Sequence, residues 1–222
     1  MSADPSNAES VVVIDDHPLF RKGVCQLLAL DDAFRVVGEA SDGERGVELV
    51  RSLDPDLVLL DLNMKGMDGI ATLTAIKADM PHVRVIMLTV SDAQDDLTAA
   101  IRAGADGYLL KDTDPEQVVD RLKRGMAGEL VVSDALAGAL MQALRAQVRG
   151  ADARGGGDPA ATLTERERDI LRALAGGRSN KVIARELSIA EGTVKVHVKN
   201  VLRKLGLRSR VEAAVWATRH EG

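Results

Sequence analysis

Short apolar runs that end in carboxylates are the feature that most constrains the fold of this chain. The run VVVI (11–14) is followed by Asp15 and Asp16, and LVLL (57–60) is followed by Asp61. Runs of branched aliphatic residues of this length predict central strands of a sheet that is covered on both faces. In an open parallel sheet, ligands bind outside the carboxyl ends of the strands. We therefore expect the three acids to converge at one edge, where their mutual repulsion requires a cation.

Two further polar side chains end predicted strands in the same way. Thr89 closes VRVIMLTV, and Lys111 closes GYLLK. Three acids, a hydroxyl and an amine at one sheet edge predict a site for a hard metal ion and a phosphoryl group. A single acid at a strand end is usually a surface charge, but a convergent set of five groups disfavours that interpretation.

Strand and helix patterns alternate five times through the first part of the chain. We expect strands over residues 11–15, 35–40, 57–62, 83–90 and 107–111. We expect helices over residues 18–30, 43–53, 69–78, 95–105 and 114–125. Five such units predict an α/β fold with a doubly wound, five-stranded parallel sheet of the flavodoxin type.

A glycine-rich segment separates this part from a shorter, all-helical part. A helix is expected over residues 133–148, and RGADARGGGDP predicts a flexible linker at 150–160, because three consecutive glycines and a proline do not hold regular structure. The predicted organisation is a flexible N-terminus at 1–9, an α/β domain at 10–130, the linker helix and linker at 131–160, and a four-helix domain at 161–222.

Capping residues predict where the four helices of the second domain begin. Thr164 and Glu167 form a capping box ahead of the first helix. The other helices are expected to open at Asn180, at Thr193 or the preceding Gly192, and at Ser209. The second and third helices, joined by SIAEG, have the proportions of a helix-turn-helix.

Charge is divided unequally between the two parts. The chain has a net charge of −5, of which residues 1–159 contribute −11 and residues 160–222 contribute +6. This asymmetry predicts a nucleic-acid partner for the basic part, with a chance distribution of solvated charge as the alternative. The third helix buries a stripe of valines and leucine, and its opposite face carries Lys195, Val196, Lys199 and Arg203. An exposed valine between lysines would suit contact with a thymine methyl group in the major groove.

The amino-acid composition indicates the cellular compartment in which the protein is expected. The single cysteine, Cys25, excludes an intramolecular disulfide and suits a reducing environment. No apolar run approaches the roughly 20 residues of a membrane helix, and MSADPSNAES lacks the features of a signal peptide. We expect a cytoplasmic protein without a membrane partner.

Two blocks of the sequence resemble one known family. DDHP (15–18), LLDLNM (59–64), Thr89 and YLLKD (108–112) resemble a two-component receiver domain. The block from LTERERDIL to VEAAVW resembles the LuxR-type helix-turn-helix of the NarL/FixJ family of response regulators. The resemblance covers nearly the whole chain. Long stretches are similar to the family's nitrate- and nitrite-responsive members in particular, although sister regulators with other signals could share them.

The resemblance implies a role for each residue at the sheet edge. Asp61 would be the phosphoacceptor, a carboxylate nucleophile that takes the phosphoryl group of a sensor histidine kinase. The implied ligands of Mg²⁺ are Asp15, Asp16, Asp61 and the backbone carbonyl of Asn63. The implied phosphoryl-binding and switch residues are Lys111, Thr89 and Tyr108.

The resemblance also implies partners and an assembly. The second domain would bind double-stranded DNA as a homodimer, with RNA polymerase as a further candidate partner. The dimerisation stripe would lie on the last helix, at Val211, Ala214, Val215 and Thr218. The competing interpretation is that this stripe closes the core of the monomer. The opposite charges of the two domains further predict that the unphosphorylated receiver covers the helix with Lys195, Val196 and Lys199.

The chain departs from the receiver pattern at two positions, and two other function classes are less consistent with its sequence. Many receivers have proline where this chain has Lys65 and Asp112, so the loop and the Lys111–Asp112 peptide could differ here. An aspartyl-phosphate phosphohydrolase is disfavoured because Asp61 is followed by Leu62 and Asn63, with no acid two residues on. A regulator gated by a small apolar ligand is disfavoured by an aromatic content of 2%.

Overall fold

The structure, a computed structural model, describes residues 8–127, 129, 131–132 and 162–220. The expected linker helix at 133–148, the linker at 150–160 and residues 1–7 of the expected flexible N-terminus lie outside the described residues. The N-terminal prediction was too long, because Glu9 already belongs to the first strand and Ala8 is buried.

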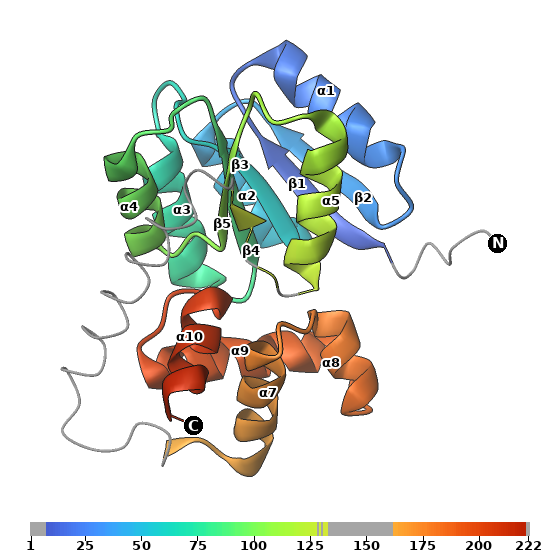
Figure 1. The fold of residues 1–222 in the computed structure, drawn as a ribbon, viewed down its shortest axis with the longest axis vertical. Helices are drawn as coiled ribbons and strands as arrows, with labels where there is room; N and C mark the ends of the chain where they lie inside the picture. The colour runs from blue at the N-terminus through green and yellow to red at the C-terminus, as the bar shows by residue number, and fades with distance from the viewer. Residues whose placement is uncertain (1–7, 128, 130, 133–161, 221–222) are drawn as a thin grey trace.

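A six-stranded parallel sheet forms the centre of the first domain (Figure 1). The strands are β1 (Glu9–Ile14), β2 (Phe34–Ala40), β3 (Leu57–Asp61), β4 (Arg84–Thr89), β5 (Gly107–Leu110) and β6 (Val131–Val132), in the spatial order β2-β1-β3-β4-β5-β6. Five of them lie within two residues of their predicted bounds. The sixth was missed because a strand of two residues has too few positions to show a periodic pattern.

Helices cover both faces of this sheet. They are α1 (Pro18–Ala29), α2 (Gly43–Leu53), α3 (Gly69–Asp79), α4 (Gln94–Ala103) and α5 (Pro115–Met126). One apolar core joins the sheet to α2, α3 and α4, and a second joins it to α1 and α5. Every residue of β3 and β4 is buried, which agrees with their continuous apolar sequences.

Four helices form the second domain: α7 (Glu165–Ala175), α8 (Asn180–Glu186), α9 (Glu191–Leu205) and α10 (Arg210–His220). The capping box of Thr164 and Glu167 is present as predicted. Two predicted starts were wrong by one or two residues. Ser179, not Asn180, caps α8, and α9 begins at Glu191 after Ala190, which makes no side-chain cap. None of the helices in the described ranges has the length and apolar character needed to cross a membrane.

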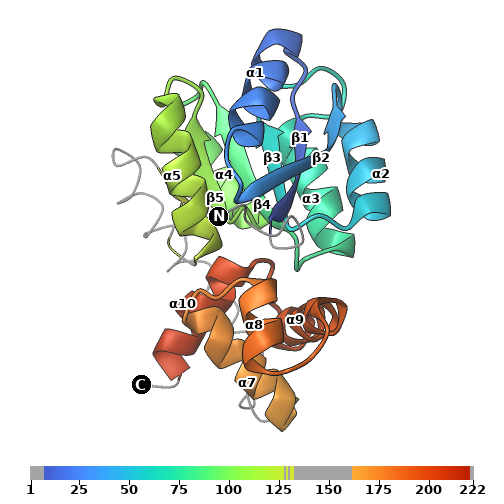
Figure 2. The same ribbon diagram turned by 90° about the vertical axis from the view of Figure 1, so that its right-hand side faces the viewer.

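The second domain packs against the edge of the sheet where the strands begin (Figures 1 and 2). Its helices contact Glu9 at the start of β1, Asp56 just before β3 and Asp106 just before β5. The carboxyl ends of the strands, which carry the acids, therefore face away from the second domain.

Candidate functional site

The three acids converge at the carboxyl ends of β1 and β3. Strand pairing places Ile14 beside Leu60, so that the residues that follow them, Asp15 and Asp61, are neighbours. Both carboxylates are buried. The Nζ atom of Lys111, which follows β5, lies 2.8 Å from Oδ2 of Asp15 and 2.8 Å from Oδ2 of Asp61. One pocket thus holds four of the predicted site residues: Asp15, half-buried Asp16, Asp61 and Lys111.

Burial sets the electrostatics of this pocket. It raises the pKa of Asp61, the charge of Asp15 raises it further, and the hydrogen bond and charge of Lys111 oppose both. Oδ1 of Asp16 is buried and makes no hydrogen bond with a described residue, whereas Oδ2 of Asp61 is paired with the Lys111 ammonium group. The backbone N–H of Asn63 donates to Oδ1 of Asp61 over 3.3 Å. Carboxylate oxygens that converge in one pocket are the ligand class that a hard divalent cation prefers.

His17 also belongs to this cluster, although the sequence predictions did not include it among the site residues. Its Nδ1 lies 2.9 Å from Oδ1 of Asp16, 3.5 Å from Oδ1 of Asp15 and 3.7 Å from Oδ2 of Asp61. It is the N-cap residue of α1, and its backbone N–H donates to Oδ1 of Asp15. The available signal was its position directly after the two acids, in DDHP.

The predicted switch residues lie beside the loop after β4. Thr89 is buried, and its Oγ1 accepts a hydrogen bond from the backbone N–H of Ser91 over 3.1 Å. The Tyr108 side chain is fully buried, and its hydroxyl donates to the carbonyl of Ser91 over 3.0 Å. Burial and the nearby charge of Asp96 raise the pKa of Tyr108 to about 12. Both residues thus contact one short loop, and Tyr108 is turned inward.

The two departures from the receiver pattern leave the pocket intact. The backbone N–H of Lys65 donates to Oδ2 of Asp16 over 3.3 Å, and its side chain is exposed. The Lys111–Asp112 peptide is trans, since no described peptide bond is cis.

The predicted DNA-reading residues of α9 differ in how far they are exposed to solvent. Its apolar stripe is buried, and Val196 is 58% exposed. Lys195 and Lys199 instead contact the first domain: Nζ of Lys195 donates to the carbonyl of Asp54 over 2.7 Å, and Nζ of Lys199 donates to that of Asp79 over 2.8 Å. Arg203 is exposed and donates to Asn200 of the same helix. The first domain thus covers Lys195, contacts Lys199 without burying it and leaves Val196 exposed, so the expected covering of α9 holds only in part.

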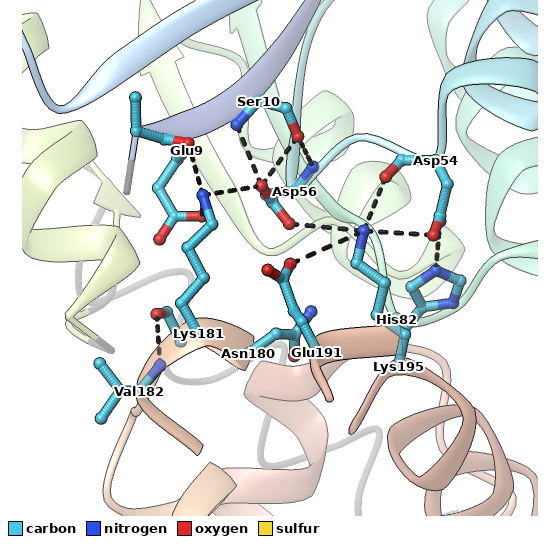
Figure 3. A network of polar contacts seen from close by, with 12 residues as sticks. Glu9, Ser10, Asp54, Asp56, His82, Asn180, Lys181, Val182, Glu191 and Lys195 are labelled. Carbon is cyan, nitrogen blue, oxygen red and sulfur yellow. Dashed lines mark hydrogen bonds and ion pairs between the residues drawn. The ribbon is translucent and has the colours of Figure 1, made fainter. Parts of the chain in front are cut away.

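A network of ion pairs joins the domains around Asp56 (Figure 3). Oδ2 of Asp56 lies 3.4 Å from Nζ of Lys181 on α8, and Oδ1 lies 3.5 Å from Nζ of Lys195 on α9. Burial alone would raise the pKa of Asp56, but the hydrogen bonds from Ser10 and the two lysine charges hold it well below its usual range. Burial and the charge of Asp56 raise the pKa of Glu191, at the start of α9, to about 7.

A second group of contacts involves the start of α10. The backbone N–H of Arg210 donates to Oδ1 of Asp106 over 3.2 Å, and Oδ2 of Asp106 pairs with buried Lys77 at 2.5 Å. The Arg208 guanidinium donates to the carbonyl of Arg102. No local sequence pattern indicates these pairings, because the residues are distant along the chain.

The predicted dimerisation stripe is divided among different surroundings. Val211 packs against the core of the first domain, and Val215 packs against the core of the second. Ala214 is half-buried, while Thr218 is exposed and donates to the carbonyl of Val215. In this arrangement both valines pack within one chain, but Val211 packs on the first domain and not on the core of the small domain, and the dimerisation stripe stays a prediction.

Two family models match the chain. The response regulator receiver domain matches residues 11–123, and the luxR family of bacterial regulatory proteins matches residues 161–217. The chain therefore belongs to the response regulators that carry a LuxR-type DNA-binding domain. It is a phosphorylation-activated transcription factor rather than an enzyme. Both matches lie inside the predicted domains at 10–130 and 161–222, whose limits stay a prediction.

Similar proteins cover almost the full length of the chain. It is 50% identical to the nitrate/nitrite response regulator protein NarL of Escherichia coli (strain K12), over 95% of this chain and 96% of that protein. It is 49% identical to NarP of the same organism, over 96% and 95%. A solved structure of the response regulator ChrA of a heme-sensing two-component system is 34% identical, with a TM-score of 0.50, over 97% of this chain and 98% of that one.

Proposed function

We propose that Asp61 is the phosphoacceptor of this response regulator and that a sensor histidine kinase is the donor. The observation that carries this is the position of Lys111 Nζ, 2.8 Å from Oδ2 of Asp61 and from Oδ2 of Asp15. A carboxylate oxygen of Asp61 attacks phosphorus while the bond from phosphorus to the histidine nitrogen breaks, which gives an acyl phosphate. Lys111 places a fixed positive charge where the phosphoryl oxygens arrive.

The acidic pocket is proposed to hold Mg²⁺. The ligands would be Asp15, Asp16, Asp61 and the backbone carbonyl of Asn63, because these oxygens belong to the class that Mg²⁺ prefers and the three carboxylates each offer an oxygen within 4.8 Å of the others. When bound, the ion would neutralise part of the negative charge that gathers in this pocket during phosphoryl transfer. Thr89 is proposed to donate to a phosphoryl oxygen once it leaves Ser91, and Tyr108 to follow the loop that both residues contact.

Acetyl phosphate tests this proposal without the kinase. Wild-type protein with Mg²⁺ should gain one phosphoryl mass that persists, whereas Asp61→Asn should gain none. Asp112→Asn, which removes an exposed acid next to Lys111, is the matched control and should be labelled like wild type. Labelling of Asp61→Asn, or labelling that excess EDTA leaves unchanged, would refute the assignment. Rapid loss of the phosphoryl group would favour the phosphohydrolase.

We further propose that α9 reads DNA and that the receiver masks it before phosphorylation. Lys195, Val196, Lys199 and Arg203 lie outside the buried stripe of α9, and all of them except Lys195 are exposed. Masking is supported because the Nζ atoms of Lys195 and Lys199 donate hydrogen bonds to the backbone carbonyls of Asp54 and Asp79 in the receiver. The fragment 155–222, which has its own apolar core, should then bind DNA more tightly than the unphosphorylated full chain at fixed salt. Equal binding would mean that phosphorylation acts through dimerisation alone.

The signal is proposed to be nitrate or nitrite, received in the cytoplasm through a sensor kinase. Support comes from 50% and 49% identity to two nitrate/nitrite regulators over nearly the full chain. A homodimer on double-stranded DNA and contact with RNA polymerase complete the proposal. Genomic fragments captured by the phosphorylated protein should be enriched upstream of anaerobic respiratory genes. Enrichment elsewhere would indicate the same mechanism with a different signal.

A further inference from the structure

We propose that Lys181 on α8 binds a phosphate group of the DNA backbone, and that Glu9 and Asp56 of the receiver take the place of this phosphate before phosphorylation. The inference rests on the proposed masking of α9 and extends it to the helix that precedes α9. It adds a DNA-contacting residue to those predicted from the sequence, and it makes the acids at this edge of the receiver a mimic of the DNA backbone.

Lys181 has its partners in the other domain. Its Nζ atom lies 3.4 Å from Oε2 of Glu9 and 3.4 Å from Oδ2 of Asp56, and it donates to the carbonyl of Ala8. Within the described residues, Lys181 makes no side-chain hydrogen bond or ion pair to its own domain. The side chain is 12% exposed in the closed form. When the domains separate, the ammonium group therefore loses its partners and becomes available to another anion.

The two helices of the helix-turn-helix place their lysines on one carboxylate (Figure 3). Oδ2 of Asp56 faces Lys181 on α8, and Oδ1 lies 3.5 Å from Nζ of Lys195 on α9. Lys195 is one of the predicted DNA-reading residues. In complexes of a helix-turn-helix with DNA, the second helix enters the major groove while the first crosses the sugar-phosphate backbone. A lysine of α8 that points the same way as Lys195 is therefore placed to meet a phosphate group.

A carboxylate resembles the phosphate group of DNA in the features that a lysine recognises. Each has a negative charge and oxygens that accept charge-assisted hydrogen bonds, and the ammonium group binds either one as a point charge. The receiver and the DNA backbone thus compete for the same Nζ atom of Lys181. Replacing this lysine should weaken DNA binding and the closed form together, a combination that a purely interdomain contact does not produce.

The test measures binding of the full-length chain to duplex DNA of random sequence at several salt concentrations. In phosphorylated protein, Lys181→Gln should lower the affinity about fivefold at about 0.15 M salt and reduce the slope of log K against log salt by about 0.9, as loss of one phosphate contact predicts. Lys181→Arg keeps the charge and should keep the slope. In unphosphorylated protein, Lys181→Gln should lower the affinity less, or raise it, because the substitution also removes contacts that close the domains.

Arg172→Gln is the matched control, because it removes a cation that pairs with Asp169 on its own helix, α7. It should leave the salt slope unchanged, and an equal fall in slope would attribute the effect of Lys181→Gln to net charge alone. An unchanged slope in Lys181→Gln would show that Lys181 binds no phosphate group. An equal loss of affinity with and without phosphorylation would show that the receiver acids do not compete for it. Equal DNA binding by the full chain and the fragment 155–222 would instead refute masking as a whole, so the two proposals can fail separately.

Discussion

Asp56→Asn should unmask the DNA-binding domain without phosphorylation. Asp56 is 6% exposed and lies at the edge where the domains meet. Its Oδ2 accepts hydrogen bonds from the backbone N–H of Ser10 at 3.0 Å and from the Ser10 hydroxyl at 2.8 Å, and its two oxygens face Lys181 and Lys195. Asparagine has nearly the same volume and keeps an acceptor for Ser10, but it removes the charge that holds the two lysines.

The magnitude follows from the two ion-pair distances. At about 3.5 Å and an effective dielectric constant of about 20, each pair gains roughly 5 kcal/mol of Coulomb energy. Most of this is cancelled by the cost of removing the charges from water. Glu191, 3.9 Å from Nζ of Lys195, can ionise and replace part of the lost charge once Asp56 no longer raises its pKa. A net loss of about 1–2 kcal/mol remains, which is about a 5- to 30-fold fall in the ratio of closed to open protein.

The assay is DNA binding by unphosphorylated full-length protein at fixed salt. Asp56→Asn should lower the Kd by up to this factor, toward the value of the fragment 155–222. Asp120→Asn is the matched control, because it removes the same charge from an exposed position on α5 and tests simple repulsion of DNA by the receiver. If Asp56→Asn and Asp120→Asn have the same effect, the ion pairs do not hold the domains closed and the reasoning is wrong.

Three further predictions follow from the same geometry. Burial and the charge of Asp56 raise the pKa of Glu191 from its ordinary value of 4.5 to about 7 in the closed form. Glu191 therefore takes up a proton when the domains close, and the closed form loses stability relative to the open form as the pH rises from about 5 to 7. Unphosphorylated protein should therefore bind DNA more tightly at pH 8 than at pH 6 relative to the fragment 155–222, and Glu191→Gln should reduce this difference. Val211→Glu should raise DNA binding to a single site, because Val211 packs on the receiver and a charge there opposes docking. It should also abolish cooperative binding to two sites if Val211 lies in the dimer interface of the open form. Calorimetry distinguishes both effects from simple unfolding of the variant. Asp61→Asn should raise the free energy of unfolding at pH 7, since the raised pKa of Asp61 means that its ionised form destabilises the fold; the gain should vanish below about pH 4, as denaturant titrations would show.

The position of the docked domain limits how the switch can work. Asp61 lies where β3 ends, whereas Asp56, Asp79 and Asp106 lie at the opposite edge, where strands begin. Phosphorylation therefore cannot displace α9 by direct contact. A signal has to pass through elements that reach both edges, and β5, which carries Tyr108 and follows Asp106, is one of them.

The sequence by itself determined the two-domain organisation, the strand and helix pattern and the meeting of Asp15, Asp61 and Lys111. Each depends on local regularities: apolar runs of strand length, helical spacing, and the rule that parallel strands end at a common edge. The stripe of α9 was predictable for the same reason, since burial of Val194 and Val198 follows from a period of 3.6 residues.

Only the tertiary structure decided which edge of the sheet meets the helices and which side chains it engages. Lys195 and Asp54 are 141 positions apart, and no periodic pattern relates them. Opposite net charge predicted attraction between the domains, but charge acts over distance and does not specify a docking surface. The sequence does not reveal the position of the His17 ring either, because its direction depends on how the chain passes from β1 into α1 beside β3. Pairings of this kind are fixed when packed surfaces exclude water around particular atoms, and that information lies in the assembled fold.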